Sequence, residues 1–515
     1  MTTAPTSPGA DDKIDATTYK IASVVVLASI MAVLDVTVVS VALPTFQTTF
    51  DANYATVAWT MTGYTLALAT VIPLTGWAAD RFGTKRLFIL ALVLFVAGSA
   101  LCSTAWSIGS LIVFRCLQGL GGGMLMPLGM TIMTKAAGPA RMGRLMAVLG
   151  VPMLLGPISG PILGGWLIDD FSWVWIFLIN VPIGVLAIAA AAVILPKDDP
   201  TPTESFDLVG MLLMSPGLAL FLYGVSTIPD EGTALTKKVL VPAAVGTVLI
   251  VAFVFHAFRP AHPLIDLRLF KDRRLTVAVV TMFLFAVAFF GALLLVPTYF
   301  LQVRGEGTLK AGVLLAPQGI GAMLTMPIAG RLADRMPPGR IVLVGLVGVV
   351  VGMAGLTQIG ATTSYGYVLG ALFVMGLGMG GTMMPMMTAA LRTLAPHQVA
   401  RGSTLMNIIQ QVASSVGTAI MSVIFTNQLA DSQLAGAAIA SRQNPALAEK
   451  FPPELLAKGF EEAADAFTTT FVVALVLLVV SFGAAFLLPR KQDPQPPAQP
   501  GGEAQGTDQA PLMMH

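Results

Sequence analysis

Long apolar stretches alternate with short polar segments along almost the whole chain. A helix needs about 20 mostly apolar residues to cross the hydrocarbon core of a bilayer. The pattern therefore predicts fourteen membrane-spanning helices and an all-α membrane protein. They are expected at residues 21–43, 56–76, 87–105, 109–132, 144–167, 174–195, 208–228, 238–258, 275–301, 310–332, 341–359, 366–390, 404–426 and 468–489.

The sequence contains an internal repeat. Residues 72–81 reappear as residues 326–335, and residues 119–127 resemble residues 376–385. The first pair keeps Pro73, Gly76, Asp80 and Arg81 as Pro327, Gly330, Asp334 and Arg335. Two ordered matches, one of them with charged residues, make chance similarity of apolar sequence a poor explanation. Two parallel halves around a central path are a recurring plan of membrane transporters.

The repeat divides the chain into two predicted six-helix bundles. We expect the N-terminal bundle at residues 21–200 and the C-terminal bundle at residues 261–490. The seventh and eighth expected spans fall between them, so residues 201–260 are predicted to be an inserted two-helix linker. Residues 427–467 are polar and are predicted to form a long outer loop of the second bundle.

The basic residues are distributed asymmetrically between the two sides of the membrane. Of the 29 Lys and Arg residues, 21 fall in segments on the side of the N-terminus, seven on the opposite side and one inside a span. Basic loops stay in the cytoplasm. Both terminal segments, residues 1–20 and 491–515, are therefore expected there, and their polar composition predicts that they are disordered.

Composition excludes several classes of function. Hydrophobic residues make up 55% of the chain and charged residues 11%, whereas soluble domains contain about 25% charged residues. A net charge of +2 gives no extended basic field for nucleic acid. The His residues are dispersed, and the chain has no Gly-x-x-x-x-Gly-Lys-Ser/Thr phosphate-binding run. We therefore expect no enzyme activity, no metal, no cofactor and no dependence on ATP.

Two ionisable residues are predicted to lie deep in the membrane. Asp35 belongs to the first expected span and Arg115 to the fourth, at similar depth. Such residues are costly in a membrane and are functional candidates by default. Burial opposes ionisation of a carboxylate and a nearby cation favours it, so Asp35 is a candidate proton carrier with Arg115 as its counter-ion. A static ion pair, or an Arg115 that serves only a backbone carbonyl, would explain the same residues.

The segment after the second expected span reads Gly76-x-x-x-Asp80-Arg81-x-Gly83-x-Lys85-Arg86. Gly76 allows close contact between helices. The charged residues of this segment and its repeat can form ion pairs at the cytoplasmic rim. Pairs that exist in only one conformation would act as a gate, and an ordinary basic loop is the alternative. The candidate gating residues are Gly76, Asp80, Arg81, Gly83, Arg86, Asp334 and Arg335.

The fifth expected span is dense in Gly and Pro. Proline removes helix hydrogen bonds and bends a span, and glycine at every fourth position forms a smooth face for close packing. This helix is therefore predicted to be both kinked and tightly packed. The residues concerned are Gly156, Pro157, Gly160, Pro161, Gly164 and Gly165.

A substrate pocket is predicted among Met-rich and aromatic spans of the second half. Flexible thioethers and aromatic faces suit a pocket that accepts many shapes, and Phe285 and Phe289 are the aromatic candidates. Polar side chains could orient a ligand or simply tie helices together. The polar candidates are Gln118, Tyr299, Gln302, Asn407 and Gln410.

These motifs resemble those of the major facilitator superfamily, and within it the fourteen-helix drug:proton antiporters, from about residue 20 to residue 490. Gly76 to Arg86 resembles the signature loop after helix two. Arg115-x-x-Gln118-Gly119 resembles a helix-four motif that the family links to proton coupling. The Gly-Pro pattern of the fifth span is similar to the family's antiporter motif, which uptake members generally lack.

Two further segments resemble the fourteen-helix branch. They are Leu34-Asp35-x-Thr37-x-x-Ser40-Val41-Ala42-Leu43-Pro44 and Asn180-Val181-Pro182-Ile183-Gly184. The chain departs from the family pattern at several positions. The departures are Ser40, Thr84, Val174 and the run Met336-Pro337-Pro338.

The resemblance implies an antiporter in the bacterial inner membrane that exports lipophilic, often cationic, drugs or other small amphiphiles and is driven by the proton gradient. Its partners would be lipophilic small molecules, protons and membrane lipids, with a periplasmic adaptor in some family members. A transporter of lipids or cell-envelope precursors on the same fold is the first alternative. A nutrient symporter is the second, and the antiporter motif argues against it.

Overall fold

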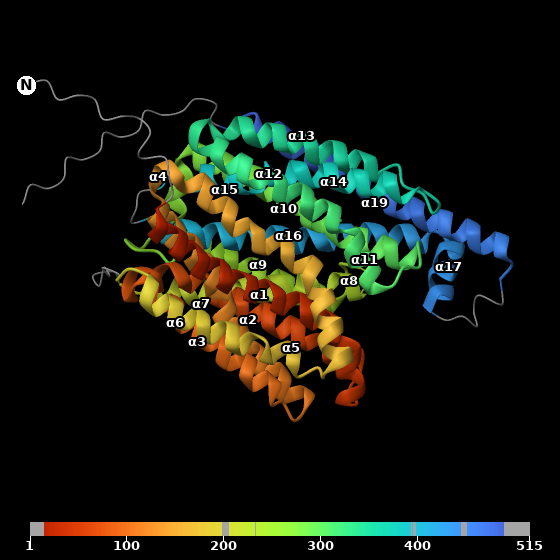
Figure 1. The fold of residues 1–515 in the computed structure, drawn as a ribbon, viewed down its shortest axis with the longest axis horizontal. Helices are drawn as coiled ribbons and strands as arrows, with labels where there is room; N and C mark the ends of the chain where they lie inside the picture. The colour runs from red at the N-terminus through yellow and green to blue at the C-terminus, as the bar shows by residue number, and fades with distance from the viewer. Residues whose placement is uncertain are drawn as a thin grey trace, which may run out of the picture.

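The computed structural model describes residues 15–197, 205–231, 233–392, 394, 398–443 and 451–488. The described part of the chain is a bundle of helices without strands. Its N-terminal part (red to yellow) and its C-terminal part (green to blue) form two groups of helices packed along each other (Figure 1). We call these groups the N half and the C half. The end of the bundle that carries Asp80 and Asp334 is called the Asp80 end, and the other is called the α17 end.

Six helices form the N half. Short connections join several of them. At the start of α2 the Asn53 side chain accepts a hydrogen bond from the Thr56 amide. Between α2 and α3 the chain turns within one residue, because Gly83 adopts a φ of +93°. The helices are α1 (Ala16–Thr49), α2 (Tyr54–Phe82), α3 (Thr84–Ser103), α4 (Ile108–Asp170), α5 (Trp175–Leu178) and α6 (Asn180–Ile194).

Helix α4 holds both the fourth and the fifth expected spans. Its 63 residues would extend for about 95 Å if straight, roughly three times the hydrocarbon thickness. Its close glycine contacts instead show that its two parts run in opposite directions. Contacts between the first part of α4 and α2 advance in the same direction along both segments, so these segments run parallel. The same holds for the second part of α4 and α1. Because α1 and α2 are consecutive and antiparallel, the two parts of α4 must run in opposite directions. The contacts are Gly119 with Tyr64, Gly123 with Leu68, Gly156 with Val33, Gly160 with Thr37 and Gly164 with Val38.

The inserted pair consists of α7 (Leu208–Ser226) and α9 (Lys237–Ala257), joined through the short α8 (Ile228–Glu231). α7 packs along α9 and also contacts α2 of the N half and α16 of the C half. The stacked rings of Trp59 and Tyr223 belong to the α2–α7 contact. The pair therefore covers the seam where α2 and α16 meet.

The C half follows η1 (Leu267–Lys271) and repeats the plan of the N half. α14 and α15 are separated at Gly381 and Thr382, where the expected span 366–390 is interrupted. The helices are α10 (Arg273–Gln302), α11 (Thr308–Leu314), α12 (Ala316–Arg335), α13 (Pro338–Leu356), α14 (Tyr365–Gly380), α15 (Met383–Leu391), α16 (Val399–Ala430), α17 (Gln433–Gln443) and α19 (Pro453–Ala485).

Thirteen helices in the described residues are long and apolar enough to span a membrane. The remaining expected span, 144–167, is the second part of α4. Two expectations on polar segments need correction. α1 begins at Ala16 rather than at residue 21, and much of the expected loop 427–467 is helical, because α16 continues to Ala430 and α17 packs against the extended start of α19. The segment 491–515 lies outside the described residues.

Candidate functional site

Asp35 and Arg115 form a buried ion pair in the N half. Arg115 Nη1 lies 2.6 Å from Asp35 Oδ2, and the two side chains are 1% and 0% exposed. Asp35 comes from the middle of α1 and Arg115 from the first part of α4, so the similar depth expected from the sequence brings them into contact. A charged pair in such an environment is stable only if further hydrogen bonds satisfy both partners.

Two amide side chains complete the hydrogen bonding of the Asp35 carboxylate. Gln118 Oε1 accepts from Arg115 Nη1 at 2.7 Å, and its Nε2 donates to Asp35 Oδ1 at 2.7 Å. The guanidinium can only donate, so it fixes the orientation of this amide. Asn180 Nδ2 donates to the same Oδ1 at 3.0 Å and to Ser99 Oγ at 3.1 Å. Three donors from α4 and α6 therefore surround Asp35, an arrangement suited to its charged form.

Arg115 is also held by α2. Its Nε donates to the Thr60 carbonyl at 3.1 Å, and its Cζ lies 4.2 Å from the centroid of the Tyr64 ring. Thr60 and Tyr64 are one helical turn apart and share a face. The guanidinium thus has a carbonyl and an aromatic face as partners in addition to Asp35.

The Gly-rich motif of α4 packs against the part of α1 that carries Asp35. A methyl group at Gly156 would overlap Val33, and one at Gly160 would overlap Thr37; at Gly164 it would lie 3.2 Å from Val38. At Gly165, no atom of the described residues lies within 4 Å of such a methyl group. The first three glycines therefore bring α4 close to the helix of the buried acid. The side chains of Pro157 and Pro161 are outside the described part of the structure.

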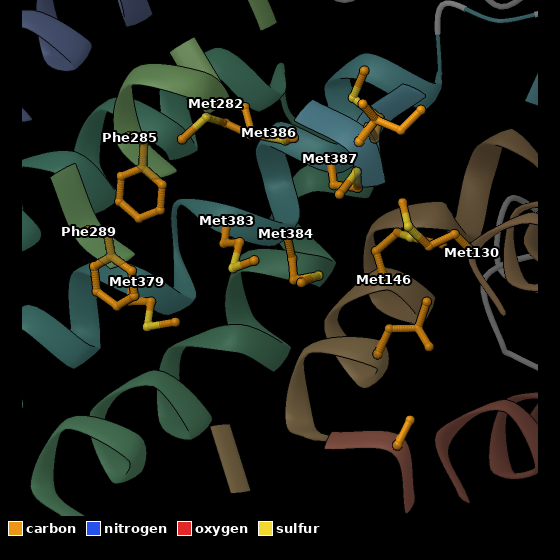
Figure 2. Packing of buried hydrophobic residues seen from close by; sticks show 14 of the residues in the cluster. Met130, Met146, Met282, Phe285, Phe289, Met379, Met383, Met384, Met386 and Met387 are labelled. Carbon is orange, nitrogen blue, oxygen red and sulfur yellow. The ribbon is translucent and has the colours of Figure 1, made fainter. Parts of the chain in front are cut away.

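A cavity of about 260 Å³ lies between the two halves. Met130 and Met146 of α4 approach it from the N half, and Met383, Met384 and Met387 of α15 approach it from the C half (Figure 2). The remaining lining combines apolar side chains with uncharged polar ones. These are Leu68, Ile72, Gly122, Gly123, Met126, Leu149, Phe290, Asn407, Gln410, Gln411 and Ser414.

Only two of the side chains proposed for the pocket line this cavity, namely Asn407 and Gln410. Gln118 is instead committed to the ion pair. Phe285 and Phe289 are stacked at 5.3 Å in the core of the C half, where α10 turns them away and presents Phe290 to the cavity. The rotation of α10 about its axis decides which Phe faces the cavity, because adjacent residues such as Phe289 and Phe290 differ by about 100° around a helix.

The other two proposed pocket residues lie near the α17 end. The Tyr299 hydroxyl donates to the Gly360 carbonyl at 2.7 Å, and its ring packs edge-on against Phe467. Gln302 is the last residue of α10, and its Oε1 is buried and has no hydrogen-bond partner in the part of the chain that the structure describes. In this conformation Tyr299 has a packing role within the C half, away from the cavity.

At the Asp80 end the two halves are joined by crossed ion pairs. Asp334 of α12 lies 2.9 Å from Arg144 of α4, and Asp80 of α2 lies 3.4 Å from Arg401 of α16. Each acid comes from one copy of the repeated motif and meets an Arg of the other half. The two acids therefore bridge the halves at equivalent places.

Further contacts strengthen the Asp334 bridge. Its Oδ1 accepts from the Gly143 amide at 2.8 Å and lies 3.0 Å from Arg392 Nη2. Gly330 packs against Gly143 so closely that a methyl group on it would lie 2.8 Å from the Gly143 carbonyl oxygen. This end of the bundle is closed in the structure.

The other predicted gating residues occupy the same end. Gly76 faces α16, where an added methyl group would lie 3.0 Å from Thr404 Oγ1, and Gly83 makes the turn between α2 and α3. The side chains of Arg86 and Arg335 are exposed, and that of Arg81 is half-buried. Asp80 and Asp334 thus form ion pairs at this end, and their partners Arg144 and Arg401 lie outside the motif.

Sequence reasoning missed Asn180 and Tyr64 as members of the buried network. Asn180 is 3% exposed and Tyr64 is 2% exposed. The available signal for Asn180 was a lone amide at the start of an apolar span, since such a group requires a partner inside the membrane. A Tyr in α2 carried no comparable signal, because aromatic residues also serve as ordinary packing.

The described features define a class: a multi-pass membrane protein built from two parallel half-bundles, with a charged network in one half and a cavity between the halves. The family model of the Major Facilitator Superfamily matches residues 25–418. The chain belongs to the major facilitator superfamily, and it is a transporter rather than an enzyme.

Curated relatives extend over most of the chain. It is 48% identical over 500 residues to a multidrug resistance protein B homolog of Mycobacterium tuberculosis, covering 93% of this chain and 92% of that protein. It is 31% identical over 411 residues to the multidrug export protein EmrB of Escherichia coli, covering 78% and 79%.

Solved structures show the same fold. The human organic anion transporter MFSD10 matches with a TM-score of 0.59 at 16% identity, covering 90% of this chain and 99% of that one. The proton:xylose symporter XylE matches with a TM-score of 0.55 at 15% identity, covering 91% and 96%. At these identities the likeness concerns the fold alone.

Proposed function

We propose that this protein is a proton-coupled antiporter that exports lipophilic small molecules across the bacterial inner membrane by alternating access. The observation that carries the proposal is the buried Asp35–Arg115 pair, 2.6 Å apart. Asp35 is surrounded by donors that only a charged carboxylate uses fully. The relatives named as multidrug resistance and export proteins support lipophilic drugs as substrates.

The network allows two states of Asp35. In the charged state the carboxylate accepts from Arg115, Gln118 and Asn180. When a proton neutralises it, the strongest of these attractions is lost. Arg115 then keeps the Thr60 carbonyl, the Gln118 oxygen and the Tyr64 ring as partners. Because Arg115 keeps these partners on α2 and α4, Asp35 can bind and release a proton repeatedly without leaving the guanidinium unpaired.

The cavity favours uncharged or weakly charged substrates. None of its lining side chains is ionisable, and residues 151–161, whose side chains are partly outside the described set, contain no ionisable residue type either. A permanent cation placed there would lose hydration without gaining a counter-charge. Met and Phe side chains adapt to many apolar shapes, while Asn407, Gln410 and Gln411 offer hydrogen bonds.

The excess of basic residues assigns the Asp80 end and both termini to the cytoplasm. On that assignment the crossed ion pairs close the cytoplasmic side. Opening the cytoplasmic side requires that Asp80 and Asp334 separate from Arg401 and Arg144.

The test is dye transport by purified protein in liposomes that carry a trapped pH indicator. Hoechst 33342 serves as the lipophilic probe, and an imposed proton gradient drives transport. Wild type is expected to move dye against protons, and Asp35→Asn to lose gradient-driven transport by about two orders of magnitude, since the carboxylate buried in the middle of α1 is gone. Asp51→Asn, an exposed acid on the connection after α1, is the matched control.

Equal coupling in wild type and Asp35→Asn would refute the assignment of the proton to Asp35. Wild type that moves no dye, but does move fluorescent phospholipid between leaflets, would replace drug export with lipid transport.

A further inference from the structure

Helix α2 contacts both the ion pair and the cavity over two helical turns. The Thr60 carbonyl accepts from Arg115, and the Tyr64 ring lies over the same guanidinium. One turn further along, Leu68 lines the cavity. Residues 60, 64 and 68 share one face of α2, so Tyr64 lies between the proton site and the cavity.

The Tyr64 hydroxyl points toward the cavity wall. It lies directly against Gly122, where an added methyl group would overlap it, and Gly122 is one of the cavity-lining residues. The rest of the Tyr64 side chain is buried, with 2% of the residue exposed. One side chain therefore reaches from the cavity wall to the face of Arg115.

Its position gives Tyr64 a mechanical role. A molecule that fills the cavity at Gly122 and Leu68 blocks movement of the Tyr64 hydroxyl toward the cavity. The ring is then kept over Arg115, and Arg115 is kept beside Asp35. In the proposed antiport cycle, the ring and the guanidinium shift away together when Asp35 takes up a proton and the cavity is empty.

We propose that Tyr64 couples the central cavity to the Asp35–Arg115 pair, so that a bound lipophilic substrate and the proton on Asp35 exclude each other. This inference rests on the proposed function, because it assigns the residue through which antiport is coupled. Tyr64 acts through Arg115 and is a positioning residue for the proton site. By linkage, substrate binding must release a proton by the same factor by which protonation weakens substrate binding.

The experiment measures two quantities on detergent-solubilised protein: the Kd for the dye N-phenyl-1-naphthylamine, which stays uncharged throughout, at about pH 5.5 and about pH 8.5, and the protons released into weakly buffered solution upon dye binding. In wild type we expect the Kd to be about tenfold lower at the higher pH, a coupling within the usual allosteric range. Dye binding should release protons at intermediate pH.

Two substitutions separate the role of the Tyr64 ring from that of its hydroxyl. Tyr64→Leu removes the aromatic ring that lies over Arg115. We expect this variant to bind dye at the higher pH with a Kd within about threefold of wild type, and its ratio of Kd values between the two pH values to fall below about twofold. Tyr64→Phe keeps the ring but loses the hydroxyl that meets the wall, and should retain part of the ratio. Tyr299→Phe is the control, because it removes another buried hydroxyl, which donates to the Gly360 carbonyl near the α17 end and away from the cavity.

Gly122→Ala provides a second test that does not require removal of the ring. Its methyl group would overlap the Tyr64 hydroxyl and should disturb coupling in wild type. In the Tyr64→Phe background the nearest ring carbon would still lie 3.2 Å from the methyl group but the overlap with the hydroxyl is gone, so adding Gly122→Ala should cause a much smaller further change.

The outcomes distinguish this inference from the proposed function. If Tyr64→Leu, or Gly122→Ala should the former fail to fold, keeps the full pH dependence and proton release, coupling does not pass through Tyr64 and only this inference is overturned. If wild type binds dye without proton release at any pH, antiport itself fails and the inference fails with it.

Discussion

Asp334 of α12 lies 2.9 Å from Arg144 of α4, and the equivalent acid of the other half, Asp80, lies 3.4 Å from Arg401. Arg401 follows Arg144 by 257 positions, close to the spacing of the repeated motif. The duplication therefore repeats the connection between the halves as well as the helices. An acid at the end of one span and an Arg at the start of another occur in each half, and each acid meets the Arg of the opposite half.

Removing the Asp334 charge should open the Asp80 end. The Asp334 side chain is 4% exposed and has two Arg partners and one backbone amide donor, so Asp334→Asn removes two charge-assisted hydrogen bonds. Each of these is worth about 1.5–3 kcal/mol in buried sites; partial exposure of the Arg partners reduces this. We expect the population open at the Asp80 end to rise about fivefold or more.

Double electron–electron resonance, which measures distances between spin labels, can detect this change. Spin labels at the exposed positions Arg86 and Arg331, one in each half, would report the separation at the Asp80 end after replacement of Cys102 and Cys116 by Ala. Asp465→Asn, an exposed acid at the α17 end, is the control. A distance distribution for Asp334→Asn identical to that of wild type would contradict a gating role.

The glycines of the α4 motif should differ sharply in their tolerance of a methyl group. Gly160→Ala would overlap Thr37 on the helix of Asp35 and is expected to cost about 1–3 kcal/mol of stability, as overpacking does, together with loss of dye transport. Gly165→Ala meets open space and should be neutral or stabilising by up to about 1 kcal/mol, because Ala favours helices. Thermal unfolding in detergent and dye transport measure both effects; equal damage by the two substitutions would argue against the packing described here.

A carboxylate introduced into the cavity should change substrate charge preference. Gln410 lines the cavity among uncharged neighbours, so Gln410→Glu supplies the missing counter-charge. We expect the ratio of tetraphenylphosphonium to triphenylphosphine oxide transport to rise by about tenfold, equivalent to about 1.4 kcal/mol. Gln358→Glu, at an exposed position after α13, is the control and should leave the ratio unchanged. No change in Gln410→Glu would mean that these probes do not enter this cavity.

The α17 end should show a pH-dependent contribution from Glu306, which lies between α10 and α11 outside the spans. Hydrogen bonds from Lys310, at 2.8 Å, and from the Tyr365 hydroxyl hold the pKa of Glu306 below its usual value. A lowered pKa stabilises the folded state above the ordinary pKa of about 4.3, and this stabilisation disappears as the pH falls through the folded-state value. Wild type should therefore be more stable to unfolding than Glu306→Gln, by an amount that is constant from about pH 7 to about pH 5 and shrinks below about pH 4.

Thermal unfolding across this pH range tests the prediction. Glu461→Gln, at an exposed position of α19, should show little difference from wild type throughout. A difference for Glu306→Gln that grows as the pH falls would have the wrong sign.

The sequence by itself determined the membrane class, the duplication and the two buried charges. The length of an apolar run decides whether a helix can span a bilayer, and a lone charge inside such a run is visible without knowledge of its neighbours. Asp35 and Arg115 could therefore be selected, and even their common depth could be inferred from the rise per residue. The repeat likewise identified Asp80 and Asp334 as equivalent residues.

Only the tertiary structure decided which residues meet. It placed Asn180 on Asp35, Tyr64 between Arg115 and the cavity, and the two motif acids against Arg residues of the opposite half. It also turned Phe290 rather than Phe285 or Phe289 toward the cavity. Every helix inside a membrane bundle is apolar over most of its surface, so the amphipathic pattern that reveals the buried face of a soluble helix is weak here. Rotation and contact are set instead by close packing between helices, which depends on residues far apart in the chain.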